Sequence, residues 1–296
     1  MPNSLITGRT RLLAVIGDPI GHSLSPVMHN RALAALGEDT VYVACPVGSQ
    51  DLEAALAGFA AIDLRGFSVT IPHKQAIMPL LGEILPVAQA VGAVNTVGRS
   101  ANGEWWGTNT DVAGFVAPLR SARGNWPGTT AVILGGGGAA RAVVAGCHEL
   151  GCDRVIIVGR NLAKLRPLQA WFQPPNPLTI PVELVPWSEM ATAIAQADLL
   201  VNSTPIGMAP KINESPMSPV DFDPLPVGAI VYDLIYTPRP TQFLQLAAAR
   251  GFQTIDGLEM LVQQGAAALE LWLGRSAPVD VMRDALLESL TSRESA

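Results

Sequence analysis

The fold is decided by one stretch, Val132-Ile133-Leu134-Gly135-Gly136-Gly137-Gly138-Ala139-Ala140-Arg141. Apolar residues before the glycines predict a strand over Ala131–Leu134, and the pattern after them predicts a helix over Ala139–Leu150. A strand, a glycine-rich turn and a helix in this order are typical of a dinucleotide fingerprint, here Gly135-x-Gly137-x-x-Ala140. Such a turn lets a pyrophosphate approach the backbone, and free N–H groups at the helix start bind it. The alternative is a turn with a structural role alone.

The end of the next predicted strand, Val155–Val158, indicates which nucleotide this turn would bind. An NAD site places Asp or Glu there to accept a hydrogen bond from the ribose 2′-OH. This chain instead has Gly159-Arg160-Asn161, with Lys164 one turn further on. Two cations without a carboxylate suit a 2′-phosphate, so we expect NADP rather than NAD. A solvated helix start with incidental charge is the other interpretation. The candidate cofactor residues are Gly135, Gly136, Gly137, Gly138, Ala139, Arg160, Asn161 and Lys164.

Apolar runs of strand type alternate with helical patterns along the whole chain, which predicts an α/β fold with mostly parallel sheets. In the first part we expect strands at Leu12–Ile16, Val41–Val43 and Gly66–Val69, helices at Pro26–Leu36, Leu52–Ala60 and Thr110–Ser121, and a hairpin of Val94–Arg99 and Glu104–Thr108. In the second part we expect strands at Ala131–Leu134, Val155–Val158, Leu199–Val201 and Ile230–Leu234, helices at Ala139–Leu150, Leu162–Phe172, Gln242–Arg250, Leu258–Leu273 and Val279–Leu290, and an irregular loop at Met208–Pro226.

The length of 296 residues suggests two domains. A segment rich in helix and strand breakers, Arg123–Gly128, precedes the second series of elements. We therefore expect one domain at 1–110, completed by helices within 251–296, and a Rossmann-type domain at 111–250.

Composition excludes several classes of protein. The net charge of −6 argues against a nucleic-acid or anionic-membrane surface. The longest apolar run ends at Arg141 and is far shorter than the roughly 20 residues of a membrane span. Leu12–Gly17 is too short for the core of a signal peptide. Three cysteines without a CxxC spacing suit a reducing compartment. We expect a cytoplasmic monomer or homodimer that binds a small molecule and no metal, nucleic acid or membrane.

Three polar segments of the first domain lie at the ends of predicted strands. One holds Ser23 and Ser25 before Pro26, the second ends in Lys74, and the third ends in Asp111. Ligands of α/β proteins bind at the carboxyl ends of strands, so these are candidate site residues. From the residues alone, Ser25 is equally well a helix N-cap, Lys74 a solvated charge and Asp111 a helix cap.

Taken together, these segments resemble the shikimate dehydrogenase family over nearly the whole chain. The motifs that carry the resemblance are Ser23-Leu24-Ser25-Pro26, Val69-Thr70-Ile71-Pro72-His73-Lys74, Ala93-Val94-Asn95-Thr96, Asn109-Thr110-Asp111, Gly135–Arg141, Asn202-Ser203-Thr204-Pro205-Ile206-Gly207-Met208, Tyr236-Thr237-Pro238 and Asp256–Gly265.

The resemblance implies reversible NADPH-dependent reduction of 3-dehydroshikimate to shikimate, a step of aromatic amino-acid biosynthesis. It implies a substrate domain and a Rossmann domain with the active site in the cleft between them. Lys74 and Asp111 would be the catalytic pair, with Lys74 exchanging a proton with the substrate oxygen. The implied substrate-binding residues are Ser23, Ser25, Thr70, Asn95, Asp111, Tyr236 and Gln264. Thr204, Leu234 and Gly257 would join the cofactor site.

Two other functions remain open at this point. A quinate dehydrogenase, or one that takes both acids, would use a substrate with the same ring and carboxylate. A non-catalytic NADP-binding regulator would share the fold, although the intact Lys74 and Asp111 argue against it. The chain also departs from the family pattern in having Gly159-Arg160-Asn161 where Asn-Arg-Thr is frequent, and Glu259 where Gly is common.

Overall fold

The computed structural model describes residues 6–294, and the chain divides into two compact units. Unit 1 takes in the chain up to Asp111 and from Val262 onward, and unit 2 runs from Val112 to Leu261. The divisions fall inside two helices, α5 (Asp111–Ala122) and α10 (Leu258–Leu273). Residues 251–261, which we expected to complete the first domain, therefore belong to unit 2.

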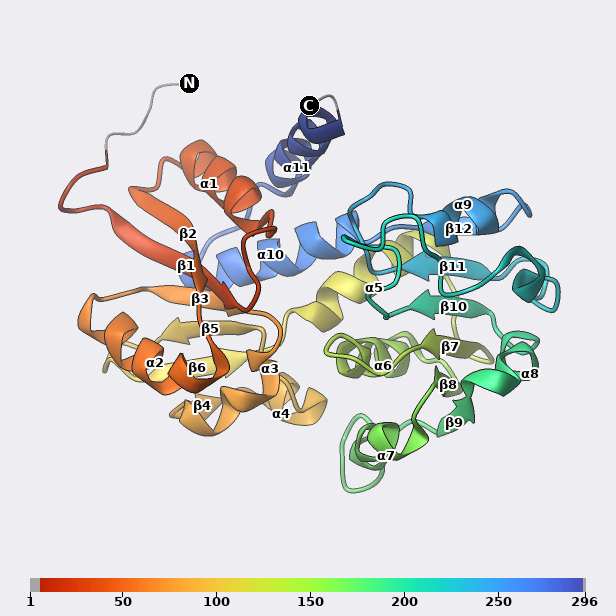
Figure 1. The fold of residues 1–296 in the computed structure, drawn as a ribbon. Coiled ribbons are helices and arrows are strands. Elements are labelled where there is room, and N and C mark those ends of the chain that lie inside the picture. The colour runs from red at the N-terminus through yellow and green to blue at the C-terminus, as the bar shows by residue number, and fades with distance from the viewer. Residues whose placement is uncertain (1–5, 295–296) are drawn as a thin grey trace. The chain divides into compact units, whose positions relative to one another are not determined.

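Unit 1 is a mixed six-stranded sheet with the order β2-β1-β3-β5-β6-β4 (Figure 1). Its three leading strands are parallel, whereas β5 and β6 form the antiparallel hairpin that the sequence predicts. The strands are β1 (Arg11–Gly17), β2 (Thr40–Pro46), β3 (Gly66–Val69), β4 (Glu83–Ile84), β5 (Thr96–Arg99) and β6 (Trp105–Thr108). The helices are α1 (Ser25–Leu36), α2 (Leu52–Ala61), α3 (His73–Ala76), α4 (Pro86–Val91), most of α10, and α11 (Val279–Glu294).

His29 is one of two buried histidines in unit 1, the other being His73. His29 on α1 is fully buried and stacks on Tyr42, with 4.2 Å between the ring centroids. Neither of its ring nitrogens has a hydrogen-bond partner within residues 6–294. Burial disfavours the charged imidazolium and lowers the pKa of His29 to about 3. The ring therefore packs as a neutral aromatic group.

Unit 2 is an all-parallel sheet with the order β12-β11-β10-β7-β8-β9. Read from the other edge, this is the usual Rossmann order, in which the two halves diverge between β7 and β10. The strands are β7 (Thr130–Leu134), β8 (Arg154–Gly159), β9 (Val182–Pro186), β10 (Leu199–Asn202), β11 (Ile230–Asp233) and β12 (Gln253–Ile255). The helices are most of α5, α6 (Ala140–Leu150), α7 (Leu162–Trp171), α8 (Met190–Ile194) and α9 (Gln242–Ala248).

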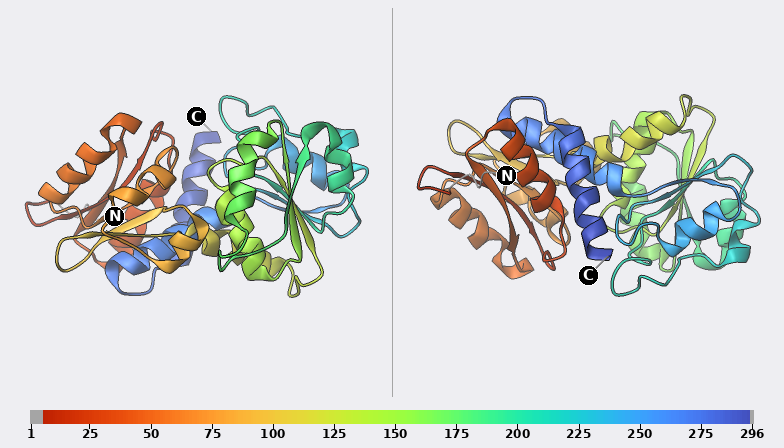
Figure 2. Two further views of the ribbon diagram at one scale, coloured as in Figure 1. Left: turned by 90° about the horizontal axis from the view of Figure 1, so that it is seen from below. Right: turned by 90° about the horizontal axis from the view of Figure 1, so that it is seen from above.

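Helices lie on both faces of this sheet, as Figure 2 shows. Every residue of β7, β10 and β11 is consequently buried, as expected for central strands of a parallel sheet. Burial explains why these strands read in the sequence as short unbroken apolar runs rather than as alternating ones. A core cluster around Val132, Ile156, Leu200 and Val231 packs on Phe243 of α9.

The sequence did not predict several short elements. Strands β9 and β12 were missed, and so were β4, α3, α4 and α8. Strand β12 has only three residues, Gln253–Ile255, and exists because it pairs with β11. The loop Met208–Pro226 is irregular as predicted, apart from one 3-10 turn at Pro219–Phe222. Along residues 6–294, no helix is both long and apolar enough to span a membrane.

Candidate functional site

Lys74 and Asp111 form an ion pair in unit 1. Lys74 lies on α3, just after β3, and Asp111 is the first residue of α5. Lys74 Nζ is 2.6 Å from Asp111 Oδ2, and the two side chains are 15% and 9% exposed. Asn95 Nδ2 donates to the other carboxylate oxygen, Oδ1, at 2.8 Å. Lys74 is therefore not a solvated charge, and Asp111 is more than a helix cap, because partners engage both of its oxygens.

Asn95 organises the polar side chains beside this pair. Its Oδ1 accepts the backbone N–H of Thr110 at 2.7 Å, which fixes the chain just before Asp111. Its Nδ2 also lies 3.0 Å from Thr110 Oγ1 and 3.5 Å from Oε1 of Gln264 on α10. The structure thus brings together four of the predicted site residues, Lys74, Asn95, Asp111 and Gln264, from distant parts of the sequence.

Three further predicted residues lie at the carboxyl ends of the neighbouring strands β1 and β3. Thr70 directly follows β3, and its carbonyl accepts the N–H of His73 in the turn that carries Lys74. Ser23 precedes α1, and its Oγ accepts the backbone N–H of Ser25 at 3.3 Å. The N-cap position of α1 is Leu24 and no side chain caps it, so the N-cap interpretation of Ser25 is wrong.

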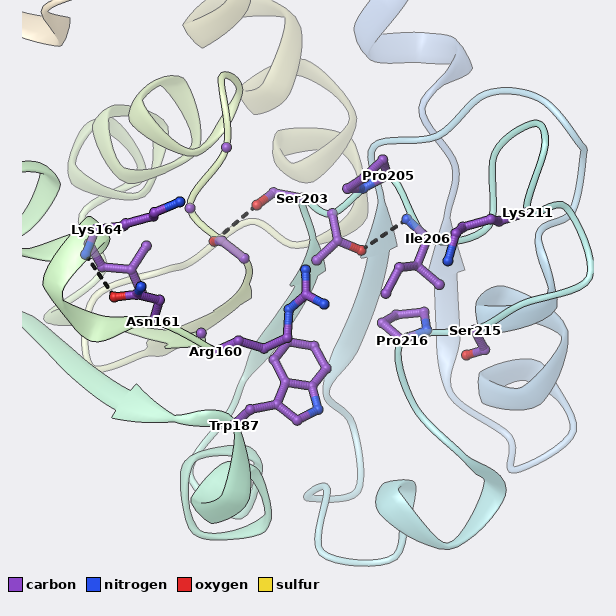
Figure 3. A pocket seen from close by; sticks show the side chains of 16 residues that line it. Arg160, Asn161, Lys164, Trp187, Ser203, Pro205, Ile206, Lys211, Ser215 and Pro216 are labelled. Atoms are coloured by element: carbon purple, nitrogen blue, oxygen red, sulfur yellow. Dashed lines mark hydrogen bonds between the residues drawn. The ribbon is translucent and has the colours of Figure 1, made fainter.

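Unit 2 contains a pocket of about 850 Å³ at the carboxyl ends of the paired strands β7 and β10, where the loops that follow the two strands separate. Figure 3 shows side chains from three loops converging on it. Its lining includes seven of the predicted cofactor residues: Gly135, Gly136, Gly137, Arg160, Asn161, Lys164 and Thr204. Four others, Gly138, Ala139, Leu234 and Gly257, are not part of the lining.

The glycine-rich turn has the geometry that the fingerprint requires. Gly135 has φ +88°, and a Cβ there would lie 2.7 Å from Cγ2 of Thr204. A Cβ on Gly136 would clash with the side chain of Leu165. Ala140, the small residue of the fingerprint, is fully buried at the start of α6. Larger side chains at Gly135 and Gly136 would therefore clash with Thr204 and Leu165 and displace the turn that the pyrophosphate approaches.

The charges around this pocket suit a phosphorylated nucleotide. Arg160, Lys164 and Lys211 line it, and no carboxylate is among the lining residues that the structure describes. Asn161 caps α7 by accepting the N–H of Lys164. Lys211 is held by Glu214, with Nζ 3.1 Å from the carboxylate. The donor set therefore fits NADP.

A buried network fixes the loops that follow β10 and β11. Asp233 is fully buried and accepts hydrogen bonds from Asn202 Nδ2 at 3.0 Å, the N–H of Ile235 at 3.1 Å and Thr241 Oγ1 at 2.7 Å. Burial is the main cause that raises the pKa of Asp233 to about 6, and the three donors oppose it. Oδ1 of Asn202 in turn accepts the N–H and the hydroxyl of Thr204.

Sequence reasoning missed several residues of this region. Trp187, Ser203, Lys211 and Ser215 line the pocket, and Asn202 and Asp233 support it. Lys211 and Ser215 lie in an irregular loop, where no periodicity marks an inward-facing side chain. Asn202 and Asp233 end buried strands, and a polar residue at that position was a usable signal. Residues 6–294 contain no cluster of His, Cys, Asp or Glu placed to hold a metal ion.

Comparison with known proteins now identifies the family. The sequence profile of the shikimate dehydrogenase substrate binding domain matches residues 15–97, and that of the shikimate 5′-dehydrogenase C-terminal domain matches residues 257–287. The NADP(+) shikimate dehydrogenase of Synechocystis is 56% identical over 286 residues, which cover 96% of this chain and 98% of that protein. The chain belongs to the shikimate dehydrogenase family. The resemblance seen in the sequence motifs is thereby confirmed.

Solved structures of the family agree with the fold. A shikimate dehydrogenase in complex with NADP+ matches with a TM-score of 0.87 and 34% identity, over 97% of this chain and 98% of that one. Quinate dehydrogenase from Corynebacterium glutamicum, in complex with NAD, matches with a TM-score of 0.86 and 31% identity, over 94% and 99% of the two chains. The predicted α/β fold with a Rossmann-type unit is confirmed.

Proposed function

We propose that this chain catalyses the reversible NADPH-dependent reduction of 3-dehydroshikimate to shikimate, a step of the shikimate pathway of aromatic amino-acid biosynthesis. The observation that carries the proposal is the buried Lys74–Asp111 pair, with Asn95 bound to the second carboxylate oxygen. Family membership supports the substrate, since the curated relative is named for shikimate and NADP+. We assign most of the substrate-binding residues to unit 1 and the cofactor-binding residues to unit 2.

In this proposal Lys74 is the proton donor. NADPH, when bound, supplies a hydride to the substrate carbonyl carbon. The charge that develops on the carbonyl oxygen requires a stabilising cation and a proton, and a lysine ammonium provides both. Asp111 holds one N–H of Lys74 Nζ, which leaves two for the substrate oxygen. In the oxidative direction, neutral Lys74 accepts the hydroxyl proton.

The remaining predicted side chains bind the substrate ring and its carboxylate. Ser23 and Ser25 would donate to the carboxylate from the loop after β1. Thr70, Asn95, Asp111, Tyr236 and Gln264 would contact the ring hydroxyls and the carboxylate. Asn95 would have two roles, because its buried amide also donates hydrogen bonds to Asp111 and Thr110 in addition to binding the substrate.

The cofactor is assigned to unit 2. Backbone groups of Gly135, Gly136, Gly137, Gly138 and Ala139 would bind the pyrophosphate at the start of α6. Arg160 would grip the 2′-phosphate as a planar fork, with Asn161 and Lys164 beside it. Thr204, Leu234 and Gly257 would complete the site toward the nicotinamide.

We also propose a cytoplasmic location and a monomer or homodimer. The free cysteines Cys45, Cys147 and Cys152 are in keeping with a reducing compartment.

Quinate dehydrogenase activity is the second candidate. The structural match to the Corynebacterium enzyme favours it, because that protein shares the same fold at 31% identity. That complex holds NAD, whereas Arg160 and Lys164 in the present pocket suit NADP. A regulator without activity would have no need for a buried Lys74–Asp111 pair.

One assay separates the three functions. The purified chain is mixed with shikimate or quinate and with NADP or NAD, and formation of the reduced cofactor is followed by absorbance. We expect rapid turnover with shikimate and NADP, and slow turnover with the other pairs. Faster turnover of quinate would establish the second candidate. If binding of NADP is measurable but neither acid is oxidised, the regulator is the correct interpretation.

A further inference from the structure

Two side chains outside the pocket lining join the loops that form it. Asn202 ends β10 and Asp233 ends β11, and the two strands are paired with these residues directly opposite each other. Both side chains are fully buried. We propose that Asn202 and Asp233 are positioning residues that lock the loops after β10 and β11 into one cofactor-binding surface. This inference rests on the proposed NADP-dependent function.

Asn202 shapes the first loop from within. Its Oδ1 accepts the Thr204 backbone N–H at 3.0 Å and the Thr204 hydroxyl at 2.7 Å. Its Nδ2 reaches the carbonyl of Ile206 at 3.3 Å. The turn between these residues is part of the pocket wall, and the methyl group of Thr204 faces Gly135 of the glycine-rich turn. A shift of Asn202 would therefore move the wall opposite the phosphate-binding turn.

Asp233 connects this turn to the second loop. Its Oδ1 accepts both Asn202 Nδ2 and the N–H of Ile235, and its Oδ2 accepts the hydroxyl of Thr241. Thr241 is also the N-cap of α9, so the carboxylate ties the loop to a helix at its far end.

The segment held in this way carries two predicted cofactor residues. Leu234 follows Asp233 directly, and its N–H donates to the carbonyl of Asn202 at 3.2 Å. The N–H of Gly257 donates to the carbonyl of Ile235 at 3.1 Å. A Cβ on Gly257 would clash with the carbonyl of Leu234, so the two backbones are in close contact. The position of both residues consequently follows from that of Asp233.

Burying a carboxylate costs desolvation free energy, so a contribution to stability alone does not explain a carboxylate at this site. Apolar residues of similar volume are often as stable as buried charges, or more stable. A carboxylate does, however, accept at both oxygens, and no neutral side chain of this size does so. The three donors around Asp233 use this property. Loop geometry therefore explains the residue better than stability does.

The test compares Asp233→Asn with two matched controls. The amide has the same shape but replaces one acceptor oxygen with a donor, so at least one of the three donors loses its acceptor. Asp198→Asn is the chemical control, because Asp198 directly precedes β10, at the opposite end of the strand from Asn202, where it accepts the N–H of Thr130. Val231→Ala is the stability control, because it removes buried methyl groups from the same strand as Asp233 and leaves the network intact.

Binding of NADPH is measured by fluorescence titration without substrate, and kcat by steady-state assay. We expect Asp233→Asn to raise the Kd for NADPH at least about tenfold and to lower kcat by a similar factor, because small misplacements near reacting groups are costly. Both controls should keep the Kd within about twofold, although Val231→Ala lowers the melting temperature. A Kd and kcat within twofold of wild type in a folded Asp233→Asn variant would overturn the proposal. An equal loss in Val231→Ala would also overturn it, since stability would then be the cause.

A second pair of variants is available if Asp233→Asn does not fold. Thr241→Val removes the hydroxyl that donates to Asp233, whereas Thr241→Ser keeps it. Weaker NADPH binding by the valine variant, with rescue by the serine variant, would support the positioning role, and equal binding by both would refute it. A wild-type chain that binds NADPH but does not oxidise shikimate would overturn the proposed reaction instead, and the titrations would still decide this inference.

Discussion

Replacing Lys74 separates its catalytic contribution from its structural one. Its ammonium is mostly buried and faces Asp111 at 2.6 Å. Lys74→Ala removes both the proposed proton donor and the cation beside Asp111. Lys74→Arg removes the proton donor but keeps a cation, because a guanidinium does not release a proton near neutral pH. The two variants should therefore have similar activity and different stability.

The magnitudes follow from burial and from the remaining partner of Asp111. Loss of a general acid costs at least about 10²-fold in kcat. Breaking a buried ion pair costs roughly 3–5 kcal/mol. Because Asn95 still donates to Asp111 after the change, we expect the lower end, about 3 kcal/mol. That loss corresponds to a decrease in Tm of roughly 6–12 °C. For Lys74→Arg we expect the same loss of kcat with a Tm decrease of only a few degrees.

Steady-state kinetics with shikimate and NADP give kcat and KM, and thermal unfolding gives Tm. KM should change less than kcat, because the lost interaction is strongest in the transition state. An arginine variant that keeps more than half of the wild-type kcat would refute Lys74 as the proton donor. An alanine variant with an unchanged Tm would refute the structural part of the reasoning, since an unpaired buried carboxylate should destabilise unit 1.

Four other predictions concern the cofactor, the substrate and the core. Arg160→Ala should weaken NADP binding by roughly 1.5–3 kcal/mol, the range for hydrogen bonds to charged groups, with little effect on NAD; equal losses for both cofactors, measured by titration, would show that Arg160 supports the fold. Ser23→Ala should raise KM for shikimate and leave NADP binding unchanged. The wild type should turn over quinate at least about tenfold less efficiently in kcat/KM, because the extra hydroxyl of quinate would be buried without a partner; equal efficiency would favour a dual-substrate enzyme. His29 has a pKa of about 3 in the folded chain and an ordinary value of 6.5. As the pH falls below about 6.5, the unfolded chain therefore binds a proton that the folded chain does not. The free energy of unfolding should decrease by roughly 1.4 kcal/mol per pH unit below that value. Urea unfolding of wild type and His29→Phe should show this slope in their difference, and parallel curves would contradict it.

The parts of the fold that the sequence predicts are those fixed by local patterns. The fingerprint around Gly135 combines a buried strand, a turn and a helix within one short stretch, and the structure places β7 and α6 within one residue of the predicted bounds. Strands β9 and β12, in contrast, were not predicted from the sequence. Strand β12 is only Gln253–Ile255, with no buried residue, so its pairing with β11 rather than its own pattern makes it a strand. Pairing across the chain is not visible in a local pattern.

The same distinction applies to the site. Lys74 and Asp111 were each visible as polar residues after strands, but nothing in their spacing reveals that the two side chains meet. Asn95, which bonds Asp111, was named only because of the family resemblance. Lys211 was not named at all, because its irregular loop has no pattern that indicates which side chains face the pocket. Contacts between distant residues are set by tertiary packing, and a motif reports them only when its family is known.

Both candidate sites nevertheless follow one topological rule. In unit 2, strand order reverses between β7 and β10, and the pocket lies there because the connections from the two strands leave toward opposite faces of the sheet. In unit 1, β1 lies between β2 and β3, so the same divergence occurs between β1 and β3. Ser23 and Ser25 follow β1, and Thr70 and Lys74 follow β3. The proposed substrate and cofactor residues therefore occupy equivalent positions in two different sheets, where buried strands hold the chain firmly and diverging loops leave room for a ligand.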